Sequence, residues 1–438
     1  MRKWLPGVAV LAVLAVLAVL AGCATEGQPE VAPPDLPSQT LLSSSMREEP
    51  VPGWTVTVAD LELPPGTVMK PIGNIGSRGL FQGITKDGWW LVGLDIANGQ
   101  RVFGPVRLAG GDGAIDYNCF VNGPPLVLCV RQGREPGAPS TAWVVDTDSG
   151  TVVFDGPTDV QVAAQEGRPR LEQIGDHAVA AVMGIGIHGV GPRGELTWFV
   201  PGDGILPAQF TSWDRDSAPS TLAVQKGMDL ADVVFSVIDG RVVEPELPQD
   251  VRLWRAMVYP GGFGYEFTDG DGQDRVAFFD DSGALLSEIA EKGSFETRSA
   301  DLPTVVTQVN DRVMTLDGRT LVVLPPTVPA VEARLIGSRL FIANDPKHEE
   351  WQQFDLRTGE TGKTCETDSL GYYYIASDGE VVIARHEDSL VRAVDLSTCE
   401  TLWSLPTPEY GVAKEVWKVH TALIQRTNDR LFSLVAPG

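Results

Sequence analysis

The sequence predicts an all-β fold, a β-propeller built from four-stranded blades, and three observations support this prediction. From residue 54 onward no segment keeps a helical period over three turns. Instead, short alternating or wholly apolar runs are bounded by Gly, Asp, Asn and Pro, as is typical of strands. The 438 residues include 47 Gly and 32 Pro, which indicates many turns. A strand–turn–strand unit also recurs about every 40 residues, the period of a propeller blade.

The repeated unit is a strand that ends in an apolar residue and Asp, followed by a turn that usually contains glycine and by a second strand. Its clearest copies occupy residues 89–103, 141–154, 274–289, 350–365 and 390–405, and weaker copies occupy residues 232–245 and 311–324. The aspartates that mark the copies are Asp95, Asp146, Asp239, Asp280, Asp317, Asp355 and Asp395. The gap between the second and third markers is about twice the usual period. We therefore place one degenerate copy near residues 190–200.

We favour an eight-bladed ring, with seven blades as the alternative, although the marked and inferred units together with the C-terminal pair are one more than eight. Either two weak copies share a blade or the inferred copy is wrong. The C-terminal residues 421–436 form a last strand pair without the marker Asp. Residues 54–59 alternate between apolar and polar side chains and are expected to complete the blade that ends at residue 435. An N-terminal strand would thus close the ring and remove an exposed edge. The predicted propeller domain spans residues 54–438.

The first 22 residues resemble a lipoprotein signal peptide. Arg2 and Lys3 precede an Ala/Val/Leu run over residues 8–20, which is too short for a comfortable membrane span. Residues 20–23 read Leu-Ala-Gly-Cys and match the bacterial lipobox, so Cys23 is predicted to carry the lipid anchor. The alternative is an ordinary secretory signal with an incidental cysteine.

Residues 23–53 comprise the lipidated Cys23 and a stretch rich in Pro, Ser and Glu with few aromatic side chains. Such a composition buries too little apolar surface to fold. We expect these residues to form a disordered tether that holds the propeller off the membrane.

The repeat is similar to that of the PQQ-like (quinoprotein-like) β-propellers, and residues 355–359 and 395–403 carry the likeness best. In the second of these copies Cys399 replaces the turn glycine. The family includes quinone-dependent alcohol dehydrogenases and the propeller lipoprotein of the outer-membrane β-barrel assembly machine. The dehydrogenases use a pair of adjacent cysteines at their quinone site, and no two cysteines are adjacent here. The resemblance therefore implies the second kind of protein, with no cofactor and no enzymatic activity.

Four cysteines of the propeller domain are predicted to form two disulfides. Cys119 and Cys129 are nearly symmetric about a turn signal at residues 122–125 and would face each other across a hairpin. Cys365 and Cys399 then pair by elimination, which would join consecutive blades. Four free thiols are the alternative, disfavoured in an oxidising compartment. A zinc site is disfavoured further by the lack of Cys-x-x-Cys spacing.

Two groups of residues are candidates for metal binding. Asp269, Asp271 and Asp274 have the close spacing of a calcium loop, although the later bidentate Glu of an EF-hand is missing. His348 and His386 lie one repeat apart in acidic sequences, in comparable turns of successive blades. In both cases we favour ordinary polar turns and predict no metal site.

Charge and motifs exclude several classes of function. The chain has 34 Lys+Arg against 58 Asp+Glu, a net charge of −24, which argues against nucleic acid as a partner. The sequence shows no nucleophile elbow, Walker loop or dinucleotide fingerprint. Gly184 and Gly186 lie in a strand-like stretch, where they indicate a bulge or tight packing.

The sequence therefore predicts a lipid-anchored propeller on the extracytoplasmic face of the cell membrane. We expect it to act as a protein-binding scaffold in the bacterial cell envelope, without catalysis, and to bind an envelope or membrane protein. The alternative is a ligand-binding or enzymatic propeller that uses its central channel for a carbohydrate or in a calcium-dependent way.

Overall fold

The computed structural model describes residues 36–110, 117–133, 138–207, 216–218, 220–248, 250–295, 301–325, 332–345, 347, 349–409 and 413–438. Leu36–Gly438 forms a single unit by its internal contacts. The predicted signal peptide, Cys23 and His348 lie outside the described residues. Within the described ranges, no helical segment has the length and hydropathy needed to cross a membrane.

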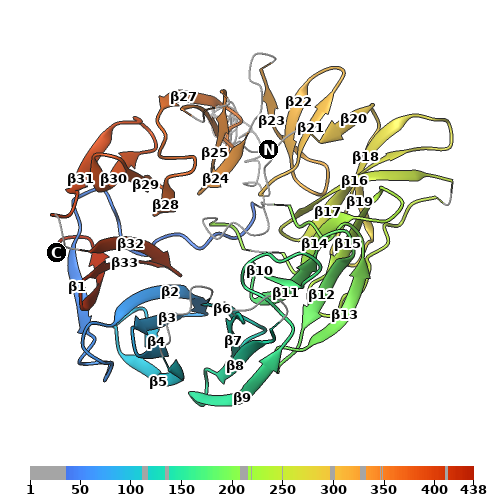
Figure 1. The fold of residues 1–438 in the computed structure, drawn as a ribbon. Coiled ribbons are helices and arrows are strands. Elements are labelled where there is room, and N and C mark those ends of the chain that lie inside the picture. The colour runs from blue at the N-terminus through green and yellow to red at the C-terminus, as the bar shows by residue number, and fades with distance from the viewer. Residues whose placement is uncertain are drawn as a thin grey trace, which may run out of the picture. The chain divides into compact units, whose positions relative to one another are not determined.

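The predicted β-propeller is confirmed. The described strands form nine antiparallel sheets arranged around a central space (Figure 1). Eight of these sheets have four strands, as predicted for the blades. The ninth sheet has two strands, β14 and β15, and the isolated bridge between Phe235 and Val242 extends its outer side. The degenerate repeat expected near residues 190–200 is present as a four-stranded blade, β10 to β13.

The blades follow one another in chain order, and each is built from consecutive strands except the last. The strands of the first three blades are β2 (Val68–Ile75), β3 (Arg78–Thr85), β4 (Gly88–Asp95) and β5 (Arg101–Gly110); β6 (Tyr117–Val121), β7 (Leu126–Arg131), β8 (Ser140–Asp146) and β9 (Thr151–Thr158); and β10 (Arg170–Ile174), β11 (His177–Val182), β12 (Gly186–Val190) and β13 (Leu196–Pro201). The next three sheets contain β14 (Leu222–Lys226) and β15 (Asp232–Ser236); β16 (Arg252–Tyr259), β17 (Gly262–Thr268), β18 (Asp274–Phe279) and β19 (Leu285–Ile289); and β20 (Gly293–Phe295), β21 (Thr304–Thr307), β22 (Asp311–Met314) and β23 (Thr320–Leu324). The last three contain β24 (Ala333–Ile336), β25 (Arg339–Ala343), β26 (Glu350–Asp355) and β27 (Thr361–Glu366); β28 (Tyr374–Ser377), β29 (Val381–His386), β30 (Ser389–Asp395) and β31 (Thr401–Pro406); and β32 (Lys414–Val419), β33 (Ala422–Thr427), β34 (Arg430–Val435) and β1 (Val51–Thr57).

The predicted closure by an N-terminal strand is confirmed. Strand β1 pairs antiparallel with β34, with Val51 opposite Val435 and Thr57 opposite Arg430. The last blade therefore combines three C-terminal strands with one N-terminal strand. This pairing covers the edge that β34 would otherwise expose.

The marker aspartate of the repeat shapes the turn between the third and fourth strands of a blade. Its carboxylate accepts a hydrogen bond from the amide two residues later, over 2.8 Å from Ala97 to Asp95 and 2.7 Å from Ser397 to Asp395. In the copies marked by Asp95, Asp146, Asp355 and Asp395 the fourth residue after the marker takes a positive φ, for example 73° at Gly99 and 62° at Cys399. Cys399 thus adopts the left-handed conformation that glycine takes in the other copies. The repeat marks a structural turn.

Apolar side chains from neighbouring blades pack together and form the core. One cluster joins Phe81 and Val92 of the first blade to Trp417, Ile424 and Leu431 of the last blade. All five side chains are buried. No blade could bury both of its faces alone, so packing around the ring stabilises the whole domain.

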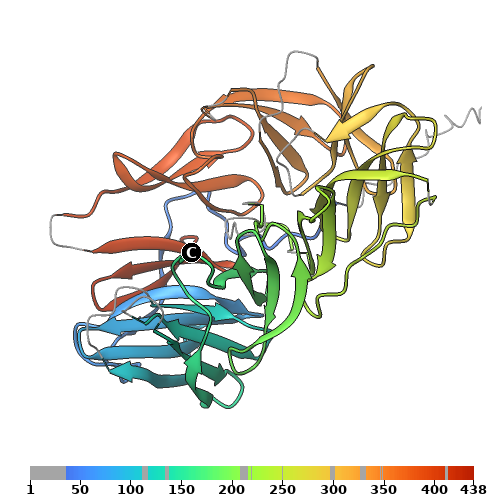
Figure 2. The same cartoon turned by 45° about the vertical axis from the view of Figure 1, so that its right-hand side comes forward.

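The antiparallel order of the strands gives the ring two distinct faces. Turns that join first to second strands, and third to fourth strands, lie on one face, which we call the segment face. Turns that join second to third strands lie on the opposite face, which we call the far face. Figure 2 shows the blades in a view turned by 45° from that of Figure 1.

The expected start of the fold at residue 54 is wrong, because residues 36–50 are packed against the ring. Figure 1 shows this N-terminal segment in blue, crossing from the centre of the ring to β1. Leu42 and Met46 are buried among side chains of the last two blades. The amide of Leu42 donates to the Ser377 carbonyl over 2.8 Å, and that of Ser43 donates to the Thr421 carbonyl over 2.9 Å. These acceptors lie on the segment face, at the ends of first strands or in the turns that follow.

Polar contacts fix the segment further along the same face. Gln39 makes two hydrogen bonds with Gly337, over 2.9 and 2.8 Å. Arg47 pairs with Asp395 over 2.8 Å, and the indole of Trp403 donates to the Met46 carbonyl over 2.8 Å. Residues 36–50 are therefore part of the propeller domain and no longer part of the expected tether.

Candidate functional site

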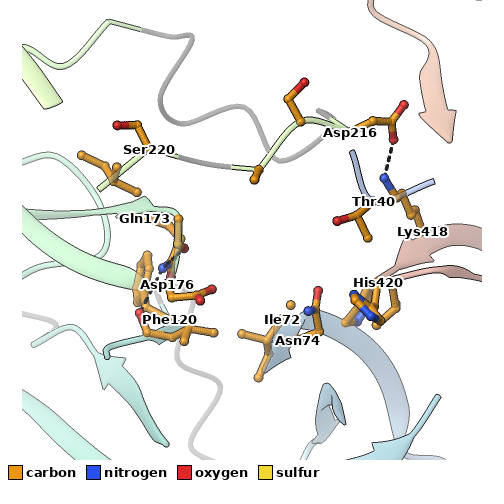
Figure 3. A pocket seen from close by; sticks show the side chains of 18 of the residues that line it. Thr40, Ile72, Asn74, Phe120, Gln173, Asp176, Asp216, Ser220, Lys418 and His420 are labelled. Atoms are coloured by element: carbon orange, nitrogen blue, oxygen red, sulfur yellow. Dashed lines mark hydrogen bonds and ion pairs between the residues drawn. The ribbon is translucent and has the colours of Figure 1, made fainter. Parts of the chain in front are cut away.

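The central space of the ring contains a cavity of about 570 Å³. Its walls are the C-terminal ends of first strands and the turns that follow them, at β2, β6, β10, β16 and β32. Thr40 of the N-terminal segment, residues 216–218, Ser220 and Asp301 complete the lining. Figure 3 shows side chains from these separate blades around one common space. The volume falls within the range of small-molecule pockets.

The N-terminal segment reaches this cavity by pairing with residues 216–218. The Thr40 amide donates to the Asp216 carbonyl over 2.7 Å, and the Ala218 amide donates to the Ser38 carbonyl over 3.0 Å. Gln39 and Ser217 form an antiparallel bridge between these two bonds. Because the paired segments cross the centre of the ring, they narrow the channel on the segment face.

A buried polar cluster lies beside the cavity. The Asp216 carboxylate accepts hydrogen bonds from the Lys418 ammonium and from the Tyr374 hydroxyl. The Arg334 guanidinium stacks over the Tyr374 ring at 4.0 Å and donates to the Leu370 carbonyl over 2.8 Å. Burial raises the pKa of Asp216, while Lys418 and Tyr374 oppose that rise. The cluster joins residues 216–218 to three consecutive blades, through Arg334 in β24, Tyr374 in β28 and Lys418 in β32.

Other polar side chains of the lining hold neighbouring turns. The Gln173 amide donates to the carbonyls of Val121 and Gly175, over 3.0 and 2.7 Å. The side-chain amide of Asn74 likewise donates to the Gly76 carbonyl over 3.0 Å. The donor groups of Gln173 and Asn74 are thus already used to hold turns. The lining as a whole contains both polar and apolar side chains, and such a wall could hold a small polar ligand.

The two predicted disulfides are confirmed. Cys119 and Cys129 lie directly opposite each other in β6 and β7, with their Cα atoms 4.0 Å apart and a sulfur–sulfur distance of 1.99 Å. Cys365 in β27 bridges Cys399, in the turn after β30, over 2.02 Å. The second bridge links two consecutive blades. The alternative of four free thiols is therefore wrong.

The calcium candidates Asp269 and Asp274 are engaged by groups of the β17–β18 hairpin and by Lys292. The Asp269 carboxylate accepts hydrogen bonds from the Gln273 amide over 2.8 Å and from the Arg275 guanidinium over 2.7 Å, and both lower its pKa. Asp274 pairs with Lys292 over 2.9 Å, which lowers the pKa of Asp274. Asp271 lies in the same β17–β18 turn, where its amide donates to Asp269 over 3.0 Å.

His386 ends β29, and its Nδ1 accepts a hydrogen bond from the Asp388 amide over 3.2 Å. This places His386 on the far face, in the second-to-third turn where the sequence predicted it. Across the part of the chain that the structure describes, no three His, Cys, Asp or Glu side chains are grouped so that they could hold a metal ion.

Sequence reasoning did not identify the residues around the cavity. Asp216, Tyr374 and Lys418 come from distant parts of the chain and belong to no motif. The sequence did contain one indication for the N-terminal segment. Leu42 and Met46 are apolar residues within a Pro- and Ser-rich stretch, which indicates that part of the expected tether packs against the folded domain.

Comparison with known proteins places the chain in a family. Residues 26–437 match the model of the conjugation-associated nine-bladed β-propeller domain. The chain belongs to this family. The two-stranded sheet β14–β15 takes the position of a ninth blade in this ring, which explains why the sequence contained one unit more than the eight favoured blades.

The propeller is also similar to an uncharacterized protein of Mycolicibacterium smegmatis (strain MKD8), with 38% identity over 435 residues, 92% of this chain and 88% of the relative. Among solved structures, the computationally designed Ika8 protein matches with a TM-score of 0.39 and 9% identity, over 91% of this chain and 100% of that chain. BamB from Moraxella catarrhalis matches with a TM-score of 0.43 and 11% identity, over 88% of this chain and 100% of that chain.

Proposed function

We propose that this conjugation-associated propeller is a lipid-anchored scaffold that binds an envelope or membrane protein on the extracytoplasmic face of a bacterial membrane. In this role it carries out no catalysis. The sequence around Cys23 supplies the anchor, and the family supplies the link to conjugation. Like the lipoproteins whose repeat it resembles, the chain would act through its surface and without a cofactor.

The observation that carries this proposal is the docking of the N-terminal segment on the segment face. Only residues 24–35 separate Cys23 from the packed segment, and a chain of that length spans roughly 40 Å when fully extended. A lipid at Cys23 would therefore keep the ring close to the membrane. Since the segment is fixed by Leu42, Met46 and Arg47, the segment face would be turned toward the bilayer and the far face toward possible partners.

The test is a chemically cross-linked purification of the full-length chain from native membranes, with Cys23→Ala as the control. The proposal predicts a stoichiometric protein partner and membrane retention of the wild-type chain, both lost in the variant. Membrane association without any specific partner would refute the scaffold role. A partner that persists with Cys23→Ala would refute the need for the anchor.

The central cavity supports a second candidate, the binding of a small polar ligand or a carbohydrate. Its volume of about 570 Å³ and its mixed lining, with Asn74, Asp176 and His420, carry this alternative. Thermal unfolding in the presence of a sugar panel, calcium or EDTA tests it. A shift of the unfolding midpoint that a substitution of Asn74 removes would support ligand binding, and no shift in any condition would count against it.

A further inference from the structure

A group of apolar side chains is exposed on the far face of two neighbouring sheets. Its five members are exposed by 49–81% of their surfaces. They are Met183, Ile185, Ile205, Met228 and Leu230, which we call the far-face patch. Single exposed apolar residues are normal on protein surfaces, whereas a cluster of them marks an interaction site.

Backbone hydrogen bonds join the three segments that carry the patch. The Gly184 amide donates to the Asp203 carbonyl over 2.7 Å, and the Asp203 amide donates to the Lys226 carbonyl over 2.8 Å. A further bond from the Gly227 amide to the Ala231 carbonyl, over 2.7 Å, closes the turn with Met228 and Leu230. The five side chains are therefore carried by neighbouring turns on one framework of hydrogen-bonded backbone.

The turn at the edge of the patch holds Leu230 in a costly conformation. Its φ is 74°, in the left-handed region that glycine and asparagine normally occupy. The side chain is nevertheless 74% exposed, so it gains little from packing within the chain. An apolar residue that is both strained and exposed indicates a role outside the folding of its own domain.

The charges around the patch indicate the chemistry of its partner. The carboxylates of Asp203 and Asp229 lie in the same turns and hold the amides of Ile205 and Ala231, over 3.0 and 3.3 Å. Asp232, which follows the turn, lies near Asp203, Lys226 and Arg255, so three carboxylates (residues 203, 229 and 232) and two cations are described around the patch. The whole chain carries a net charge of −24. An acidic surface with an apolar centre complements a segment that presents apolar side chains beside basic ones.

We propose that the far-face patch is the docking site for a protein partner with such a segment, apolar and flanked by Lys or Arg. This inference rests on the scaffold function proposed above and names its binding surface. The exposed methionines suit this role, because flexible thioether side chains adapt to an apolar partner. A lipid surface is the weaker occupant, because anionic lipids repel the acidic border and the patch lies opposite the N-terminal segment.

The experiment places a photo-cross-linking amino acid at Met228 of the full-length chain in native cells. The control position is Val153 in β9, which is 53% exposed and outside the patch. The proposal predicts an adduct with one other protein at position 228 and none at position 153. An adduct with lipid, an adduct with a second copy of this chain, or no adduct at all would overturn it.

The captured protein is then purified and its binding to the purified chain is measured. Leu230→Asp should weaken binding at least tenfold, Val153→Asp should change it less than twofold, and added salt should weaken the wild-type complex. Leu230→Gly should weaken binding while raising the thermal midpoint of the free chain, a pair of results that misfolding cannot produce. Binding unchanged by Leu230→Asp would overturn the proposal.

The two proposals fail in different ways. A partner that needs Cys23 but gives no adduct at position 228 would refute the patch and leave the scaffold function standing. The lack of any protein partner in either experiment would refute both.

Discussion

Replacing Met46 by alanine tests whether the N-terminal segment is part of the fold. The Met46 side chain is fully buried among Leu42, Trp403 and Leu434, and its carbonyl accepts the Trp403 indole hydrogen bond. The substitution removes three heavy atoms, which corresponds to about 2.4 kcal/mol of lost transfer free energy at roughly 0.8 kcal/mol for each. A residual cavity adds to this loss, so we expect the free energy of unfolding to fall by about 3 kcal/mol.

The measurement is denaturant unfolding of the purified chain, followed by tryptophan fluorescence because Trp403 contacts Met46 directly. Met228→Ala is the matched control, since this methionine is 74% exposed. The control should change the free energy of unfolding by less than about 0.5 kcal/mol. Met46→Ala should also speed proteolytic cleavage within residues 36–50. An equally small effect of both substitutions would refute the packed position of the segment.

Three further predictions follow from particular side chains. Burial alone would raise the pKa of Asp395, but hydrogen bonds from Ser397 and Thr398 and the Arg47 guanidinium outweigh it and lower the pKa to about 2. The ionised form therefore stabilises the fold by about 2 kcal/mol above the unfolded pKa of about 4, and this stability is lost as the pH falls from about 5 to 2. Denaturant unfolding across that range should show the loss, and Asp395→Asn should remove that part of it; an unchanged pH profile in the variant would contradict the assignment. Leu230→Gly should raise the free energy of unfolding by about 0.5–1 kcal/mol. The strain energy released at the positive φ exceeds the entropic cost of fixing the more flexible glycine. A destabilised variant in thermal or denaturant unfolding would show that no strain is present. Replacing Cys365 and Cys399 together by serine should cost about 4 kcal/mol, as expected for a bridge across 34 residues; a loss below about 1 kcal/mol in the same assay would mean that the bridge constrains little.

The repeat was readable because its information is local. Asp395 and Cys399 lie in one turn, where the carboxylate and the positive φ act within four residues of each other. The closure of the ring was also predictable from local sequence. The alternation of apolar and polar side chains at residues 54–59 indicates a strand, and a strand needs the edge of a sheet to pair with, here β34. The disulfide between Cys119 and Cys129 followed from the symmetry of a single hairpin.

The remaining features depend on contacts between distant parts of the chain. The composition of residues 36–50 predicts disorder, and only the ring supplies the apolar surface that Leu42 and Met46 bury. The pair of Asp216 with Lys418 is formed by the circular arrangement of the blades, which no spacing in the sequence encodes. The far-face patch is likewise assembled from three segments that backbone hydrogen bonds bring together.

The most direct test of the account is lysine-reactive cross-linking of native membranes, with the cross-linked residues mapped by mass spectrometry. Lys226 borders the far-face patch, whereas Lys363 lies in β27 away from it. The account predicts cross-links from Lys226 to one basic envelope or membrane protein, lost when Cys23 is replaced by alanine. Partner cross-links that avoid Lys226, or that persist without Cys23, would contradict a membrane-anchored scaffold that binds through its far face.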